Sequence, residues 1–153
     1  LFSLKTDNTS HVASQKPQKQ IPFNFLCDTN ILGELSKKKP AARVLRWAEG
    51  VQKISISVIT VEEIYFGLTW KPNPRVQSWI ENFVQSQCAV LPITSQTARM
   101  AGYLRGQMQS RGITRTQADM LIAGTAHEHG LTLVTLNDRD FKGCGIAVLN
   151  PDD

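Results

Sequence analysis

Short apolar runs alternate with longer amphipathic stretches from Ile21 to the end of the chain. The runs lack strict alternation with polar residues, which is typical of strands buried on both faces of a parallel sheet. They predict strands at residues 23–27, 54–57, 90–93, 131–135 and 146–149. The stretches between them predict helices at residues 31–36, 41–48, 61–68, 74–87, 96–110 and 117–129. This order predicts an α/β domain of three layers, α/β/α, with a mostly parallel central sheet.

Polar and glycine residues mark several helix ends. Thr60 with Glu63, and Thr116 with Asp119, have the spacing of a capping box and predict helix starts. Gly112 and Gly130 stand where a glycine commonly follows a helix.

A chain of 153 residues, 41% of them hydrophobic, is long enough for one buried core. Residues 1–20 are rich in Ser, Thr, Asn, Gln and Lys and show no periodicity, so we expect a flexible tail, a linker or vector-derived sequence. The folded domain is then expected to span residues 21–153.

The net charge of +4 gives only weak support for a polyanionic partner, because the excess is spread along the chain. Cys27, Cys88 and Cys144 form no CxxC pair, which favours reduced thiols and a cytoplasmic location. The sequence has no apolar run as long as a membrane span and no signal-peptide pattern.

Acidic and amide residues follow several predicted strands. Asp28 directly follows the first strand, Glu63 falls in the first turn of a helix, and Asp119 opens another helix. Asn137, Asp138 and Asp140 follow the fourth strand. Each has an ordinary structural explanation as a cap or turn residue. Carboxylates gathered at one sheet edge, however, repel one another unless a cation compensates, and Mg²⁺ favours such oxygen ligands.

Four segments in order, LCDTNIL, VEEIYFG, QADMLIAGTA and LVTLNDRDF, resemble the PIN-domain ribonuclease toxins of the VapC family, from about Phe25 to Pro151. The resemblance implies a PIN-like nuclease fold and Mg²⁺- or Mn²⁺-dependent hydrolysis of RNA. It implies catalytic and metal-binding roles for Asp28, Glu63 and Asp119. Glu63 is chosen over Glu62 because the family pattern places an aliphatic residue next and Gly four residues later.

The fourth acidic position departs from the fullest family pattern, which has Asp where this chain has Asn137. Many VapC-like sequences have Asn there and Asp three residues later, so we rank Asp140 first, Asn137 second and Asp138 third. Asp140 is then a fourth catalytic residue and metal ligand, with Asn137 as a further ligand. Thr29 and Asn30 resemble supporting residues that hydrogen-bond around the site.

The hypothesis is therefore an endoribonuclease, the toxin of a type II toxin-antitoxin pair, in which a metal-activated water attacks a backbone phosphate. The resemblance also implies a homodimer and a VapB-like antitoxin whose tail lies in an apolar groove and blocks the acids. Leu32, Leu35, Val44 and Trp47 could line such a groove, although packing onto the sheet is the favoured interpretation.

Basic residues flank the acidic segments, and we predict RNA-phosphate contacts for four of them, although solvated surface is an equal alternative: Lys38, Arg43, Arg115 and Arg139. Trp47, Trp70 and Trp79 could stack bases, but two of them suit a core or an interface better, and Trp70 is ambiguous.

Two other function classes are open. A PIN-like module that binds RNA or protein with weak or no catalysis is favoured only by Asn137. A phosphoryl-accepting signalling domain is far less favoured, because it needs a pair of acids near the first strand, and LCDTN has one.

Overall fold

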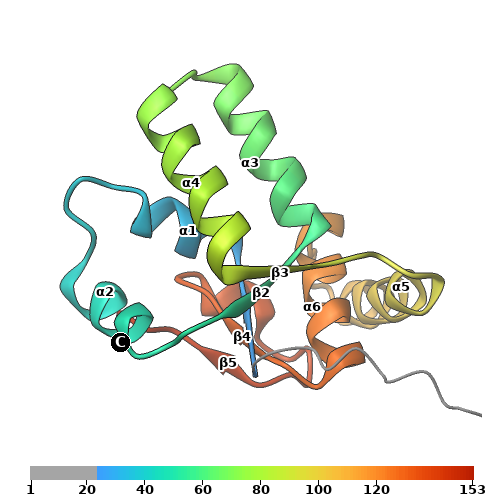
Figure 1. Cartoon of the computed structure of the whole chain (residues 1–153). Helices are drawn as coiled ribbons and strands as arrows, with labels where there is room; N and C mark the ends of the chain where they lie inside the picture. The colour runs from blue at the N-terminus through green and yellow to red at the C-terminus, as the bar shows by residue number, and fades with distance from the viewer. Residues whose placement is uncertain (1–23) are drawn as a thin grey trace, which may run out of the picture.

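The computed structural model describes residues 24–153; the tail expected at residues 1–20 lies outside them. Its sheet has five strands in the order β3-β2-β1-β4-β5 (Figure 1), and every neighbouring pair is parallel. The strands are β1 (Phe25–Cys27), β2 (Ile54–Ser57), β3 (Cys88–Leu91), β4 (Thr132–Val134) and β5 (Val148–Leu149). The predicted parallel sheet is confirmed.

Helices occupy the predicted stretches. They are α1 (Thr29–Leu35), α2 (Ala42–Glu49), α3 (Val58–Trp70), α4 (Pro74–Gln87), α5 (Ser95–Ser110) and α6 (Gln117–His129), with a short 3₁₀ helix, η1, at Asp138–Phe141. The third strand begins two residues earlier than predicted, because α4 runs into β3 without a loop.

The predicted start of α3 is wrong. Ser57 is the N-cap residue, and its hydroxyl accepts the backbone N–H of Ile59 at 3.1 Å. The helix therefore begins at Val58, and Thr60 is buried within it. Glu63 lies in the second turn of α3 and not in a capping box with Thr60.

The predicted start of α6 at Thr116 and its predicted end at Gly130 are confirmed. The hydroxyl of Thr116 accepts the backbone N–H of Asp119 at 3.1 Å, and Gly130 ends the helix with a left-handed φ of 62°. This cap fixes Asp119 in the first turn of α6. Because α6 leads into β4, its N-terminal end lies at the carboxyl edge of the sheet.

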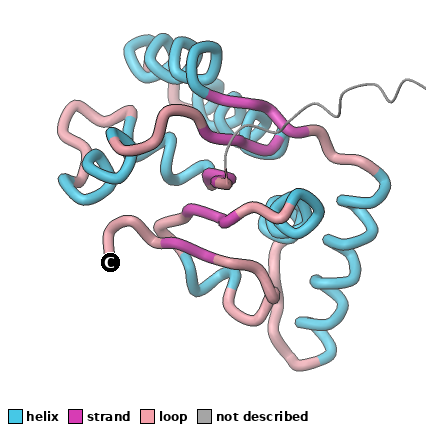
Figure 2. Tube along the Cα trace, turned by 60° about the horizontal axis from the view of Figure 1, so that its bottom comes forward, coloured by secondary structure: helices cyan, strands magenta, loops and turns pink. Residues whose placement is uncertain are grey.

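Two hydrophobic cores lie on opposite faces of the sheet. Leu26 of β1 packs in the core that α5 and α6 cover, whereas its neighbour Cys27 packs in the core formed with α1 to α4. Leu133 and Val134 of β4 divide in the same way. Figure 2 shows the strands between the two groups of helices, which confirms the three-layer α/β/α architecture.

Gly124 lets α5 and α6 approach closely, because an added Cβ would lie 2.9 Å from the Thr97 carbonyl oxygen and 3.2 Å from the Ala101 nitrogen. We expect Gly124→Ala to lower the free energy of unfolding by about 1–3 kcal/mol, since backbone atoms must move apart. Gly102→Ala is the matched control: its Cβ would meet nothing within 4 Å, and its helix propensity improves. Urea denaturation of both variants measures the difference, and equal stability would contradict the packing argument.

Candidate functional site

Asp28 lies at the carboxyl end of the central strand β1 and is the N-cap of α1, as its sequence position predicts. Its Oδ1 accepts the backbone N–H of Thr29 at 2.7 Å. Only 7% of the residue is exposed. A carboxylate buried to this degree requires hydrogen bonds or a cation to offset lost hydration.

Glu63 reaches the same edge from α3. Its Oε1 accepts the hydroxyl proton of Thr29 at 2.8 Å, so Thr29 joins the two acidic segments through its backbone and its side chain. Asn30 lies next to Thr29 and donates to the Oδ2 of Asp28 at 3.4 Å, while its own Oδ1 accepts the backbone N–H of Leu136 at 3.1 Å. These contacts agree with supporting positions for Thr29 and Asn30.

Thr135 is the residue that sequence reasoning missed. It is fully buried just after β4, and its hydroxyl donates to the Oδ2 of Asp28 at 2.9 Å. The Thr135 hydroxyl oxygen itself accepts from Asn30 Nδ2 at 3.2 Å and from the backbone N–H of Asn137 at 3.0 Å. Both acceptor positions are thus used, and the proton is directed at Asp28. A Thr at a strand end beside acidic residues was the signal that could have identified it.

The carboxylates act on one another electrostatically. The pKa of Asp28 is raised from 3.8 to about 6: burial is the largest cause and the charges of Asp119 and Glu63 add to it, while hydrogen bonds from Thr135 and Thr29 oppose the shift. Burial also raises the pKa of Asp119, as does the charge of Asp140. Asp28 is therefore close enough to Asp119 and Glu63 to feel their charges, and Asp119 is close enough to Asp140.

The segment after β4 contains the three candidates for the fourth acidic position, Asn137, Asp138 and Asp140, and they have different hydrogen-bond partners. Asn137 donates through Nδ2 to the Oδ2 of Asp140 at 2.8 Å, and Asp140 is the residue whose charge acts on Asp119. Asp138 instead accepts from Asn150 Nδ2 at 3.2 Å, toward the C-terminal segment. This geometry places Asn137 and Asp140 together and turns Asp138 away from them, while the ranking itself stays a prediction.

The acidic edge suits a small, hard cation. Its side-chain donors are oxygen atoms, and their mutual repulsion would be relieved by a divalent charge. Within residues 24–153, no three His, Cys, Asp or Glu side chains are placed so that together they could hold a metal ion. Mg²⁺ retains several of its own waters and is typically bound by only a few carboxylates, so an open arrangement fits it.

Two of the four basic residues predicted to bind RNA make contacts within the protein. Arg115 donates through Nη2 to the carbonyl oxygens of Arg139 at 3.1 Å and Lys142 at 3.3 Å, which holds the η1 loop beside Asp119. Arg43 donates to the carbonyl oxygen of Asp152 at 3.0 Å. The side chains of Lys38 and Arg139 are exposed.

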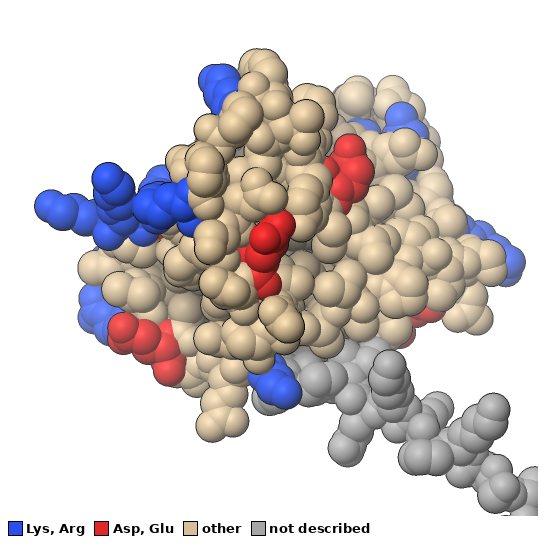
Figure 3. All heavy atoms as spheres, turned by 45° about the horizontal axis from the view of Figure 1, so that its top comes forward, with Lys and Arg blue, Asp and Glu red and all other residues tan. Residues whose placement is uncertain are grey.

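Basic side chains gather at one edge of the face shown in Figure 3, where Figure 1 places the connection between α1 and α2. This connection contains the exposed residues Lys37, Lys38 and Lys39. Acidic side chains lie at the lower part of the same edge and nearer the middle of this face.

The fold and the site place the chain in the class of three-layer α/β/α domains that carry a carboxylate site at the carboxyl edge of a parallel sheet. The family model described as "PIN domain" matches residues 25–145. The chain belongs to the PIN-domain family and, within it, to the VapC toxins.

Relatives and solved structures agree with this assignment. The chain is 31% identical to the VapC ribonuclease Y4jK of Sinorhizobium fredii, over 83% of this chain and 96% of that protein. It is 34% identical to the tRNA(fMet)-specific endonuclease VapC of Shigella flexneri, over 80% and 93% of the two chains. The structure is similar to DNA-bound VapBC from Salmonella typhimurium, with a TM-score of 0.73 at 30% identity and coverage of 84% and 98%.

A second structural neighbour is FitAcB from Neisseria gonorrhoeae, with a TM-score of 0.72 at 27% identity, covering 83% of this chain and 97% of that one. None of the helices within residues 24–153 is long and apolar enough to cross a bilayer.

Proposed function

We propose that the protein is a Mg²⁺- or Mn²⁺-dependent endoribonuclease, the toxin of a type II toxin-antitoxin pair. The observation that carries the proposal is the buried carboxylate of Asp28 at the carboxyl end of β1, which Thr29 links to Glu63 by hydrogen bonds and on which the charge of Asp119 acts. The charge of Asp140 acts in turn on Asp119. Relatives named as ribonucleases and endonucleases over most of this chain support it.

A bound divalent cation would supply an activated water and charge stabilisation at the scissile phosphate. Asp28, Glu63, Asp119 and Asp140 would hold it, with Asn137 next to Asp140. Thr135 keeps Asp28 oriented by donating to its Oδ2, and Thr29 does the same for Glu63. These side chains therefore set the ligand geometry before substrate arrives, which lowers the cost of organising the site during reaction.

Titration of Mg²⁺ against a labelled RNA separates this enzyme from the alternative, a PIN-like module that only binds RNA or protein. We expect product to appear with added Mg²⁺ and to vanish in EDTA. RNA binding without product across the titration would favour the alternative. Sequencing the RNA ends formed after brief induction would then identify the substrate and the cleavage position.

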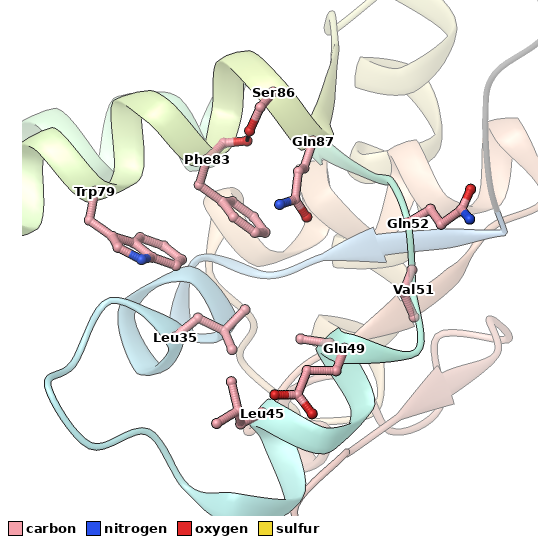
Figure 4. Close-up of a pocket in the computed structure, with 10 residues that line it drawn as sticks. Leu35, Leu45, Glu49, Val51, Gln52, Trp79, Phe83, Ser86 and Gln87 are labelled. Atoms are coloured by element: carbon pink, nitrogen blue, oxygen red, sulfur yellow. Dashed lines mark hydrogen bonds between the residues drawn. The ribbon is translucent and has the colours of Figure 1, made fainter.

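A groove of about 750 Å³ between α1, α2 and α4 is our candidate site for the antitoxin (Figure 4). Leu35, Leu45, Trp79 and Phe83 point into it. The rings of Trp79 and Phe83 stack with centroids 4.8 Å apart. A preformed apolar groove between helices suits an amphipathic segment of a partner. The two structural neighbours compared above, VapBC and FitAcB, support the assignment of this partner as a VapB-like antitoxin.

The residues that we named for such a groove are mostly packed inside the protein. Leu32 and Val44 are fully buried, and Trp47 packs edge-on against Phe25, so packing onto the sheet was the correct interpretation for them. Leu35 alone also lines the groove.

Leu45→Glu tests the groove, because Leu45 is 40% exposed at its wall and can change without disturbing the core. We expect at least about 10-fold weaker binding of the cognate antitoxin in calorimetry, since a charge would be buried at the interface. Tyr103→Glu, at an exposed position of α5 away from the groove, is the control. Equal affinity of the Leu45 variant and the native chain would contradict this assignment.

A second apolar surface is our candidate for the homodimer contact. Val58, Tyr65 and Val90 are 36%, 46% and 43% exposed, respectively, around a pocket between α3 and α4. Sedimentation velocity should show a dimer of the 17.0 kDa chain that Val90→Glu weakens.

We also propose a cytoplasmic location, which the free thiols of Cys27, Cys88 and Cys144 favour and cell fractionation can check.

A further inference from the structure

Two large aromatic side chains stand exposed near the C-terminal end of α3. Phe66 is 64% exposed and Trp70 is 68% exposed, and their ring centroids lie 6.2 Å apart at an interplanar angle of 40°. With Thr69 they line a shallow pocket of about 280 Å³. Exposed aromatic surface of this kind often marks a binding site. Trp47 and Trp79, by contrast, pack against other aromatic rings.

The pair lies on the same side of α3 as the acidic residue Glu63. At about 100° per residue, Trp70 lies about 20° around the helix from Glu63, and Phe66 lies about 60° from it. At 1.5 Å per residue, the two aromatic residues are about 5 and 10 Å farther along the helix axis. A nucleic-acid strand that leaves the acidic site along α3 would therefore meet Phe66 first and Trp70 second.

A cation accompanies the aromatic pair. Lys71 is the C-cap of α3, and its Nζ lies 4.7 Å from the centre of the Trp70 ring. Aromatic faces combined with a positive charge are the arrangement by which proteins hold single-stranded nucleic acids, because every base has a face that stacks. The charge of Lys71 is available to an adjacent phosphate.

The surface is too small for a second protein. Two side chains cannot supply the roughly 800 Å² per partner that a stable protein interface buries. The exposed apolar side chains around the pocket between α3 and α4 do not extend this surface, because Tyr65 lies about 140° around the helix from Trp70. Stacked bases, in contrast, need no more than one ring each.

We propose that Phe66 and Trp70 stack unpaired bases of the RNA next to the scissile phosphate. The preferred substrate region is then single-stranded, a loop or an end, with purines favoured because they stack over a larger area. This inference rests on the proposed ribonuclease function and adds the kind of RNA segment that the site accepts.

Binding of fluorescein-labelled RNA octamers in EDTA tests the proposal without cleavage. The probes are octa-adenylate, octa-uridylate and an abasic octamer of the same backbone. We expect Phe66→Ala and Trp70→Ala each to weaken octa-adenylate binding by about 10-fold, with a smaller effect on octa-uridylate and little on the abasic chain. Trp70→Phe should restore most of the affinity. Tyr103→Ala, at an aromatic residue 59% exposed on α5, is the matched control and should change affinity less than about twofold.

Unchanged affinity of both alanine variants would overturn the proposal. So would a change in their sedimentation or in antitoxin affinity with RNA binding intact, because the surface would then be a protein contact. The two hypotheses fail separately. Trp70-dependent binding by a chain that cleaves no RNA with Mg²⁺ would refute only the nuclease, whereas Mg²⁺-dependent cleavage that both alanine variants retain in full, with unchanged binding, would refute only the stacking.

Discussion

Asp119→Asn is expected to lower RNA cleavage by at least about 10³-fold, equivalent to about 4 kcal/mol of transition-state stabilisation. The substitution removes one negative charge from the acidic edge but leaves the cap of α6 intact, because the capping hydrogen bond runs from the backbone N–H of Asp119 to Thr116. The fold and thermal unfolding should therefore stay close to those of the native chain. Initial rates on a labelled RNA at saturating Mg²⁺ measure the loss.

Asp138→Asn is the matched control, since it removes a carboxylate from the same neighbourhood that is turned toward Asn150. Its rate should fall by no more than about threefold, as for an ordinary surface change. The cleavage rate of Asp140→Asn should lie between the rates of these two variants or close to that of Asp119→Asn, because the charge of Asp140 acts on Asp119. Native-like cleavage by the Asp119 variant would refute the acid-centred mechanism, and a large loss in the Asp138 variant would reverse our ranking of the fourth ligand.

The second large effect is a pH-dependent stability penalty from Asp28. Its pKa is 3.8 in the unfolded chain and about 6 in the folded one, so the folded state holds the proton more tightly. Stability contributed by this group is therefore greatest below pH 3.8, falls as pH rises toward 6, and levels off above that. Without metal, the shift costs roughly 3 kcal/mol at neutral pH.

Asp28→Asn removes this titration. The difference in free energy of unfolding between the variant and the native chain should change by roughly 2.4 kcal/mol in favour of the variant between pH 4 and pH 8 in EDTA. Any misfit of the amide with the Thr135 hydroxyl is independent of pH and cancels from that change. Urea denaturation across the pH range measures it, and parallel profiles for the two proteins would contradict the raised pKa.

Added Mg²⁺ should favour the native chain over the Asp28→Asn variant in free energy of unfolding, the reverse of the effect of high pH without metal. At pH 8 it should stabilise the native chain by about 2.7 kcal/mol when its concentration is 100 times the dissociation constant. The Asp28→Asn variant should gain much less, because a principal ligand has lost its charge. This comparison tests metal binding without any measurement of cleavage.

The sequence predicted the elements well because each buried strand is a compact apolar run and most helices have polar boundaries. It placed α3 less well, because VITVEEIYFGLTW is apolar around most of its circumference. Such a helix has no clear buried face in its periodicity, so neither its start at Val58 nor the exposure of Phe66 and Trp70 could be inferred. Thr135 was missed for a related reason, since a β-branched residue at a strand end needs no functional explanation.

By itself, the sequence determined the order of strands and helices and the positions of Asp28 and Asp119 at element ends, because these follow from hydrophobic pattern and capping chemistry, which are local. Only the tertiary structure decided which donors face Asp28, which of Asp138 and Asp140 turns toward Asp119, and which aromatic side chains remain exposed. Those outcomes depend on contacts between residues distant in the chain, such as Thr135 with Asp28, which the parallel pairing of β1 and β4 brings together.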